Sequence, residues 1–344
     1  MTGDAENTLS GRRHTLLLAA VSEFIATAEP VGSNQIASRH HLGIKSAMVR
    51  NMMSELEDAG FLSQPHTSAG RVPTDKAFRY FVDHLSGARI GFEDRSQIEL
   101  HYSGRGRDLA LLMRDTPKLL SILTGQAAMV MAPRLESVEL ESVNFIRIRQ
   151  QEVLAVFVAT NGTVQNRLVA TDRDHPQGEL DRMAAYLNES LGGRTLDEAR
   201  EWIEAQLKLE RARYDRFVRE ALVLGEAIAG RAEPIEVYVD GSVQALEQPE
   251  FTDPGKVREL LRALDDKTAL LELLERSIRE QGLMVSIGSE NPRLSGFAVV
   301  AAPYIGGSKP LGSLAIVGPV RMDYERVIPL VEYTARALSK IFEL

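Results

Sequence analysis

The sequence predicts an α+β protein in which a helical region with one hairpin precedes a longer part that alternates strands with helices. Apolar residues recur at helical spacing between residues 12 and 85, whereas residues 138–169 and 283–318 contain runs typical of strands. Residues 179–230, between those strand-rich blocks, are densely charged and predicted to be almost wholly helical. The chain has 344 residues, a length that favours two or three domains.

Composition indicates a globular protein without disulfides. Charged residues make up 26% of the chain and its net charge is −8, yet residues 12–79 contain more Arg and Lys than Asp and Glu. The absence of cysteine excludes disulfides, thiolate metal ligands and cysteine nucleophiles, and suits a reducing compartment. The N-terminus has neither the charge pattern of a signal peptide nor an apolar run of about 20 residues. We therefore expect a cytoplasmic protein without a membrane partner.

The first elements predict two short helices joined by a tight turn. A helix from Arg12 to Thr27 stops before Pro30, and Ser33 is a candidate N-cap for a short helix that ends before Gly43. Ser46 is a candidate N-cap for the next helix, which ends at Gly60. Its predicted buried stripe consists of Val49, Met52, Met53 and Leu56.

A hairpin follows directly. Phe61 and Leu62 begin an extended segment, a polar loop at 63–71 returns into Val72 and Pro73, and Thr74 caps a closing helix. Two helices and a turn followed by a hairpin predict a winged helix-turn-helix, whose second helix presents its N-terminal residues to the DNA major groove.

The candidate DNA-contacting residues lie on both helices and on the hairpin. Arg50 and Asn51 are expected to read bases, because Arg pairs with guanine and Asn with adenine in bidentate geometry. Hydroxyl groups and cations of the helix start and hairpin suit phosphate oxygens. The full set is Ser33, Asn34, Gln35, Lys45, Ser46, Ala47, Met48, Arg50, Asn51, His66, Thr67, Ser68 and Arg71.

Other chemistry finds little support in the sequence. His40, His41 and His66 are possible metal ligands, but no carboxylate or cysteine shares their spacing, and we expect solvated or phosphate-facing histidines and no metal site. The glycine-containing segments 288–291 and 306–309 lack the layout of a phosphate-binding loop and are interpreted as hairpin loops. No catalytic constellation is evident, so neither an enzyme nor a cofactor is expected.

The remaining three quarters suggest a divided domain. A glycine-rich and charged stretch puts a boundary near residue 88, and a connecting helix is predicted at 108–124. Strands are predicted at 138–148, 153–158 and 164–169, with a turn at Asn161 and Gly162, and again at 236–241, 283–288, 297–302 and 311–318. A terminal helix begins at Tyr324. Antiparallel strands bracketed by helices are the GAF-like pattern, and the helix-rich block between them resembles an insertion.

The segment QPHTSAGRVPTDKAFRYFVD at residues 64–83 closely resembles the N-terminal signature of the HrcA family of heat-inducible transcription repressors. Weaker likeness follows in VFVATNGTVQNRLV, LNESLGG, PEFTDPGKVRELL and the final segment GSLAIVGPVRMDYERVIPLVEYTARALSKIF, so it covers nearly the whole chain. Met48 and Met52 depart from the residues expected of the family in the recognition helix.

The resemblance implies a homodimer that binds an inverted-repeat operator in double-stranded DNA ahead of chaperone operons, with its activity maintained by the GroE chaperonin. It also implies a GAF-like domain interrupted by a dimerisation insert. The expected domains are 1–88 for the winged helix-turn-helix, 89–170 with 241–344 for the GAF-like domain, and 171–240 for the insert. Two alternatives stay open: a metabolite-gated regulator that uses the GAF-like domain as its sensor, and an enzyme with a DNA-binding tether.

Overall fold

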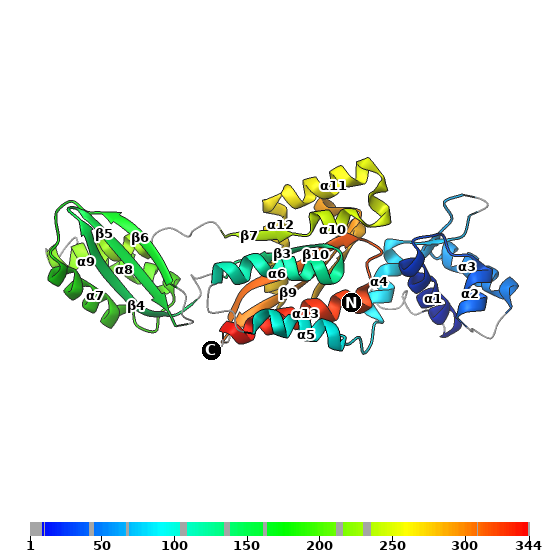
Figure 1. The fold of residues 1–344 in the computed structure, drawn as a ribbon, viewed down its shortest axis with the longest axis horizontal. Helices are drawn as coiled ribbons and strands as arrows, with labels where there is room; N and C mark the ends of the chain where they lie inside the picture. Colours follow the sequence, from blue (N-terminus) through cyan, green and yellow to red (C-terminus); the bar gives the residue numbers. More distant parts are fainter. Residues whose placement is uncertain are drawn as a thin grey trace.

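The protein is elongated and consists of three units in a row (Figure 1). The computed structural model describes residues 9, 11–40, 45–66, 69–103, 109–133, 138–160, 164–210, 216–229, 235–307 and 309–342. We call the three parts the N-terminal unit (α1–α4), the central unit (α5–β3 and β7–α13) and the outer unit (β4–α9). The mixture of helices and sheets agrees with the predicted α+β class.

The N-terminal unit contains the predicted helices and hairpin. Its elements are α1 (Gly11–Thr27), α2 (Ser33–Arg39), α3 (Ser46–Asp58), β1 (Leu62–Ser63), β2 (Val72–Pro73) and α4 (Asp75–Asp83). All four residues of the predicted α3 stripe are buried, and Gly60 beyond the helix has a φ of 77°. β1 and β2 pair antiparallel, with Leu62 opposite Pro73. Thr74 caps α4, because its side chain accepts a hydrogen bond from the Ala77 amide.

The predicted N-caps of α2 and α3 are wrong by one residue. Gly32 and Lys45 occupy the cap positions, and neither helix has a side-chain cap. Ser33 and Ser46 are instead the first helical residues, and their hydroxyl oxygens lie 3.4 Å apart. The two serines therefore link the starts of α2 and α3 to each other instead of capping their own helices.

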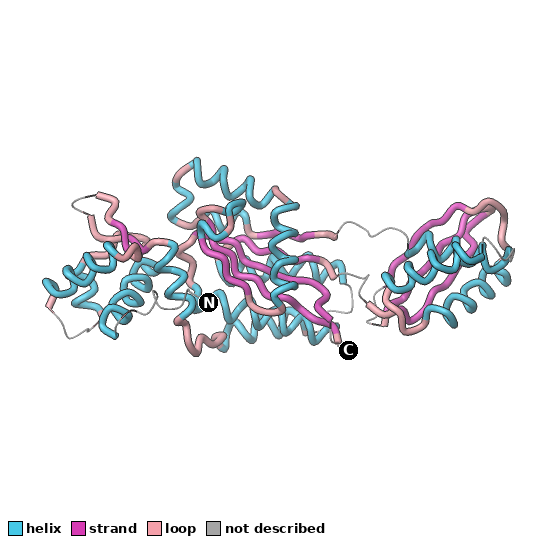
Figure 2. Tube along the Cα trace, turned by 180° about the vertical axis from the view of Figure 1, so that it is seen from behind, coloured by secondary structure: helices cyan, strands magenta, loops and turns pink. Residues whose placement is uncertain are grey.

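The central unit is an antiparallel sheet between two helical layers (Figure 2). Among the described residues its strand order is β7-β3-β10-β9-β8. α6 and α13 pack on one face, with α5 against α13, whereas α10 and α12 pack on the other face, with α11 beside α12. Its strands are β3 (Ala127–Met131), β7 (Val237–Asp240), β8 (Met284–Ile287), β9 (Phe297–Gly306) and β10 (Lys309–Pro319). Its helices are α5 (Phe92–Tyr102), α6 (Leu109–Thr124), α10 (Ser242–Leu246), η2 (Pro249–Thr252), α11 (Pro254–Asp265), α12 (Lys267–Glu280), η3 (Gly288–Glu290), η4 (Pro292–Leu294) and α13 (Tyr324–Phe342).

The outer unit has its own sheet, whose order is β4-β5-β6 within the described residues. Its elements are β4 (Leu140–Arg149), β5 (Glu152–Ala159), β6 (Val164–Ala170), α7 (Gln177–Leu191), α8 (Leu196–Glu210) and α9 (Arg216–Ala229). α7 and α9 pack on one face of this sheet. The strands lie in front of the helices in Figure 1 and behind them in Figure 2, so the helices cover one side only.

This arrangement differs from the expected boundary at residue 170. The three strands at 140–170 pair with one another and pack on α7 and α9, so they lie in the outer unit and not in the sheet of the central unit. The segment 288–290, interpreted as a hairpin loop, is the short helix η3. The turn predicted at Asn161 and Gly162 lies outside the described residues. No helix in the described ranges is long and apolar enough to cross a membrane.

Candidate nucleic-acid interface

The leading face of α3 is open to solvent. Lys45, Ala47, Met48, Arg50 and Asn51 are all exposed, with Met48 exposed to 49%. The opposite face of the helix packs into the N-terminal unit. Arg50 forms no ion pair with any residue that the structure describes, so its guanidinium is available to a ligand. The first turns of α3 therefore present a cation, an amide and a thioether to solvent together.

The start of α2 adjoins the start of α3. The Ser46 hydroxyl donates to the Oδ1 of Asn34 and lies beside the Ser33 hydroxyl. Asn34 is exposed, whereas Ser33 and Ser46 are half-buried. These three predicted DNA contacts thus form one polar group at the junction of the two helices, where they fix the position of α3 relative to α2.

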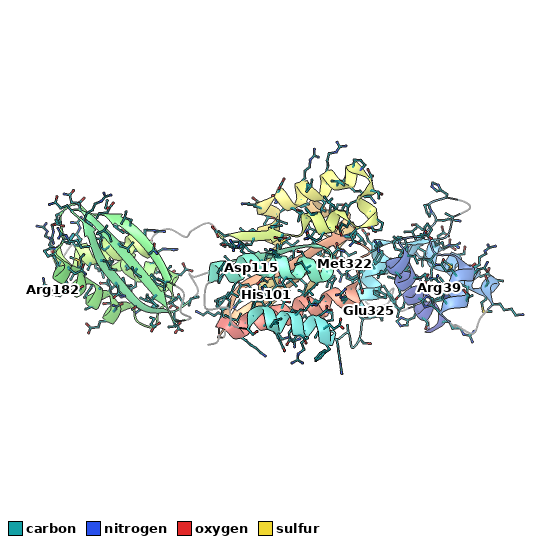
Figure 3. All side chains as sticks on the ribbon, viewed as in Figure 1. Arg39, His101, Asp115, Arg182, Met322 and Glu325 are labelled. Atoms are coloured by element: carbon teal, nitrogen blue, oxygen red, sulfur yellow. The ribbon has the colours of Figure 1, made fainter. Side chains whose placement is uncertain are left out.

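Gln35, another predicted DNA contact, belongs to a cluster around the buried Glu23. The carboxylate of Glu23 is 6% exposed and accepts from Gln35 Nε2 at 2.6 Å and from Arg39 Nη1 at 2.5 Å, and His40 Nε2 lies 3.2 Å away. Arg39, labelled in Figure 3, lies in the N-terminal unit. Burial raises the pKa of Glu23, but the hydrogen bonds from Gln35 and His40 and the charge of Arg39 outweigh it, so the pKa is lower than usual.

This cluster holds α2 against α1, and sequence reasoning missed its central residue. Glu23 stands within the apolar stripe of the first helix, directly before Phe24, and an acidic side chain at such a position is the signal that it needs a buried partner. Gln35 is held by that carboxylate, so its place in the site is to orient α2.

The hairpin lies next to α3. Arg71 is 15% exposed and its Nε donates to Oε2 of Glu57 in α3 at 2.8 Å. Its backbone pairs with Val31, between α1 and α2. A Cβ at Gly70 would lie 2.6 Å from the Pro30 carbonyl oxygen, so this close approach requires glycine. His66 is exposed, and Thr67 and Ser68 lie outside the described residues.

A group of possible metal ligands occurs far from this interface, in the outer unit. His175, Glu179 and Glu220 offer ligand atoms within 4.8 Å of one another. Arg173 Nη2 donates to both carboxylates at 2.5 Å, and this hydrogen bonding lowers the pKa of Glu179 and brings that of Glu220 to about 2. Arg216 Nε also donates to Glu220 Oε1 at 2.9 Å, so the two guanidinium groups of Arg173 and Arg216 balance the charge of the two carboxylates, and these ion pairs account for the cluster.

Comparisons with known proteins agree with the sequence resemblance. The family model described as the HrcA protein C-terminal domain matches residues 111–328. The heat-inducible transcription repressor HrcA of Geobacter sulfurreducens is 39% identical over 338 residues, which cover 97% of this chain and 98% of that relative. The repressor of the same name from Sorangium cellulosum is 38% identical over 339 residues, which cover 97% of this chain and 98% of that relative.

A solved structure has a similar fold over the whole chain. It is a crystal structure described as that of a hypothetical protein, with a TM-score of 0.64 and 25% sequence identity, and the match covers 97% of this chain and 99% of that one. Identities above 35% over nearly the full length of two named relatives, together with the family-model match, are decisive. The chain therefore belongs to the HrcA family of heat-inducible transcription repressors.

Proposed function

We propose that this protein represses chaperone operons by binding an inverted-repeat operator in double-stranded DNA as a homodimer. The observation that carries the proposal is the exposed leading face of α3 beside the β1–β2 hairpin. In this proposal α1–α4 form a winged helix-turn-helix, with α3 as the recognition helix in the major groove and the hairpin as the wing.

The candidate residues divide into two groups by what surrounds them. Arg50 and Asn51 are exposed without a protein partner among the described residues, and they are assigned to base readout. Lys45 and the polar group of Ser33, Asn34 and Ser46 are assigned to phosphates and to the position of α3. Ala47 and Met48 supply apolar contacts at the same face.

The hairpin residues are proposed to contact the DNA backbone. His66, Thr67, Ser68 and Arg71 are assigned to phosphate or minor-groove contacts. Gln35 and Arg71 both donate to carboxylates of the N-terminal unit, so part of their contribution is to hold α2 and the hairpin in place.

An uncovered sheet face supports the homodimer. The face of β4-β5-β6 opposite α7 and α9 carries apolar side chains in register, since Leu154 lies opposite both Ile146 and Leu168. Ile146 is 44% and Leu168 53% exposed, and Val156 on the same face is half-buried. Contiguous apolar surface of this kind is typical of a protein interface. A second copy of the chain is the proposed occupant, because an inverted repeat requires twofold symmetry.

The central unit is proposed to be GAF-like, and GroE is proposed to maintain the active repressor. The outer unit is inserted between β3 and β7, which pair with each other in the central sheet, so β7 cannot join that sheet until Ala128 and Asp240 meet. Discontinuous folds of this size expose apolar surface while they fold, and chaperonins bind such intermediates. Chaperonin supply would thereby set the amount of folded repressor.

Selection of DNA by the full-length protein tests the central proposal. The purified chain is incubated with a randomised duplex pool, bound duplexes are amplified over several rounds, and the enriched sequence is measured in a gel-shift assay against an unselected duplex. We expect an inverted repeat that binds at least about 10³-fold more tightly than the unselected duplex at physiological salt. Enrichment of no common sequence, or of a single half-site bound by a monomer, contradicts the proposal.

Refolding tests the chaperonin proposal separately. Denatured protein is diluted with and without GroE and ATP, and the yield of duplex-binding protein is measured in both. The yield is expected to be higher with GroE. Equal yields contradict the chaperonin dependence and leave the DNA-binding proposal intact.

A further inference from the structure

Helix α4 joins the N-terminal unit to the central unit through a bidentate ion pair. Arg79 Nε donates to Oε1 of Glu290 at 2.8 Å, and its Nη2 donates to Oε2 at 2.6 Å and to the Val285 carbonyl oxygen at 2.5 Å. Glu290 Oε2 also accepts from the Ile287 amide at 2.9 Å. Bidentate pairing fixes direction as well as distance, so the orientation of α4 is tied to the end of β8.

A second contact lies one turn earlier on the same helix. The Ser289 amide donates to Oδ2 of Asp75 at 2.9 Å. Gly288 has a φ of 54°, and a Cβ there would lie 2.1 Å from that oxygen. Only glycine allows Asp75 to approach η3 this closely. We call Asp75, Arg79, Ser289 and Glu290 the α4 clamp.

A third contact joins the two units away from the clamp. Arg321, which follows β10, forms an ion pair with Glu250 and donates through Nη1 to the Ile25 carbonyl oxygen in α1 at 2.7 Å. The rings of Phe78 in α4 and Tyr324 in α13 lie 6.3 Å apart. Met322 and Glu325, labelled in Figure 3, lie near this junction. Contacts on α1 and α4 together resist rotation of the N-terminal unit about either helix.

We propose that the α4 clamp is a positioning device for operator recognition, which sets the spacing between half-sites that the dimer accepts. This inference rests on the proposed function. The orientation of the N-terminal unit on the central unit determines where each α3 points in a twofold dimer. Half-site spacing in DNA mirrors the separation of the two recognition helices, so a rigid clamp demands one spacing and a released clamp tolerates several. The clamp residues do not contact DNA in this mechanism.

The spacing preference is the readout that tests the clamp. The inverted repeat selected by the wild-type protein is synthesised with one to five base pairs added to or removed from its centre, and dissociation constants are measured for the whole series. An insertion of two base pairs rotates one half-site by about 70° and moves it by about 7 Å, so we expect wild-type binding to weaken at least about tenfold.

Variants on both sides of the clamp are compared with the wild type. Arg79→Gln and Glu290→Gln each break the ion pair from one unit, and Asp75→Asn weakens the second contact. Arg79 is 29% and Glu290 38% exposed, and ion pairs this exposed contribute little to stability, so folded variants are expected. In each of the two ion-pair variants we expect the affinity for the selected spacing to fall about three- to tenfold. Insertion of two base pairs should then weaken binding by that variant less than about threefold further. Asp75→Asn should shift the profile in the same direction.

A coupled response distinguishes the clamp from general damage. The double variant Arg79→Gln with Glu290→Gln should behave like Arg79→Gln alone, because Arg79→Gln already removes the ion pair with Glu290 as well as the hydrogen bond to the Val285 carbonyl oxygen. Arg95→Gln is the matched control, since Arg95 pairs with Glu99 within α5 and does not cross the junction. The control should keep the wild-type profile.

The outcomes separate the two proposals. If the wild type selects an inverted repeat with a narrow spacing preference and both ion-pair variants keep that preference, the clamp inference is overturned and the proposed function stands. The clamp inference is likewise overturned if the variants lose affinity equally at every spacing. If the wild type selects no inverted repeat, the proposed function itself fails, and the clamp inference fails with it.

Discussion

Arg71 in the hairpin donates through Nε to Oε2 of Glu57 in α3 at a distance of 2.8 Å. These side chains are 15% and 30% exposed, so the pair lies at the edge of the unit and not within its core. It connects the proposed wing to the proposed recognition helix. A change at either residue is therefore expected to alter DNA binding in two ways, by changing the charge of the surface and by moving the hairpin relative to α3.

Arg71→Ala should weaken binding to the selected operator and to an unselected duplex by similar factors, because a phosphate contact carries no sequence information. The dependence of the logarithm of affinity on the logarithm of salt concentration should become shallower by about one unit. Gel shifts over a salt series measure both quantities. Glu57→Gln is the comparison, since it releases Arg71 without removing it, and its affinity should equal or exceed that of the wild type at low salt. A loss as large as that of Arg71→Ala would assign the pair to holding the hairpin only.

Arg50→Ala should weaken operator binding about 5- to 150-fold, which corresponds to about 1–3 kcal/mol for one bidentate base contact. Binding to an unselected duplex should change much less, and fluorescence anisotropy with both duplexes measures the difference. Ser54→Ala is the control, because Ser54 is exposed on α3 one turn beyond Arg50. Equal losses for both duplexes would rule out base readout by Arg50.

Ile146→Glu should shift the protein from dimer toward monomer. A carboxylate on β4, opposite Leu154 on the open β4-β5-β6 face, would be desolvated in an interface and left unpaired. Sedimentation velocity over a concentration series measures the dissociation constant, which we expect to rise at least about tenfold. Leu100→Glu replaces an apolar residue of α5 that is 75% exposed, and it should leave the dimer unchanged. An unchanged dimer in Ile146→Glu would exclude this face as the interface.

The outer unit should lose stability in acid through Glu220. Hydrogen bonds from Arg173 lower the pKa of this carboxyl from 4.5 to about 2 in the folded protein. The ionised group therefore stabilises the fold above about pH 4.5, and this contribution is lost progressively as the pH falls toward 2. Glu220→Gln should melt at a lower temperature than the wild type at pH 7, and the difference should shrink below pH 4.5.

Circular dichroism melts between pH 7 and pH 3 measure this difference. Glu280→Gln, which removes an exposed ion pair with Arg276 on α12, should have little effect at any pH. A difference between Glu220→Gln and the wild type that stays constant from pH 7 to pH 3 would show that ionisation of Glu220 does not stabilise the fold.

Most elements were predictable where the apolar pattern was long and bounded. The α3 stripe, the hairpin pairing, the Thr74 cap and the last three strands all follow from local spacing and turn residues. β3 was missed because AAMVM is a short apolar run without alternation, and every residue in it is buried. α5 was missed because its stretch is polar, with Ile98 as its only fully buried residue among those described.

The expected domain boundary at residue 170 differs from the structure for another reason. Strands 140–149, 152–159 and 164–170 were correctly predicted as strands, but local pattern does not reveal which sheet a strand joins. Here the three consecutive strands pair as a meander and α7 and α9 cover them. The partners of β3 are β7, where Ala128 pairs with Asp240, and β10, where Val130 pairs with Leu314, and both pairings join residues more than 100 positions apart.

The sequence by itself determined the family, the helices and hairpin of the N-terminal unit, and the solvent-facing residues of α3, because these depend on motifs and on spacing within a few turns. Only the tertiary structure decided the partners of three polar side chains. Gln35 donates to Glu23 and Arg71 donates to Glu57. Arg79 donates to Glu290, which lies 211 residues away along the chain. The physical reason is that a polar side chain takes the partner that packing brings within about 3 Å of it, and sequence distance does not restrict that choice.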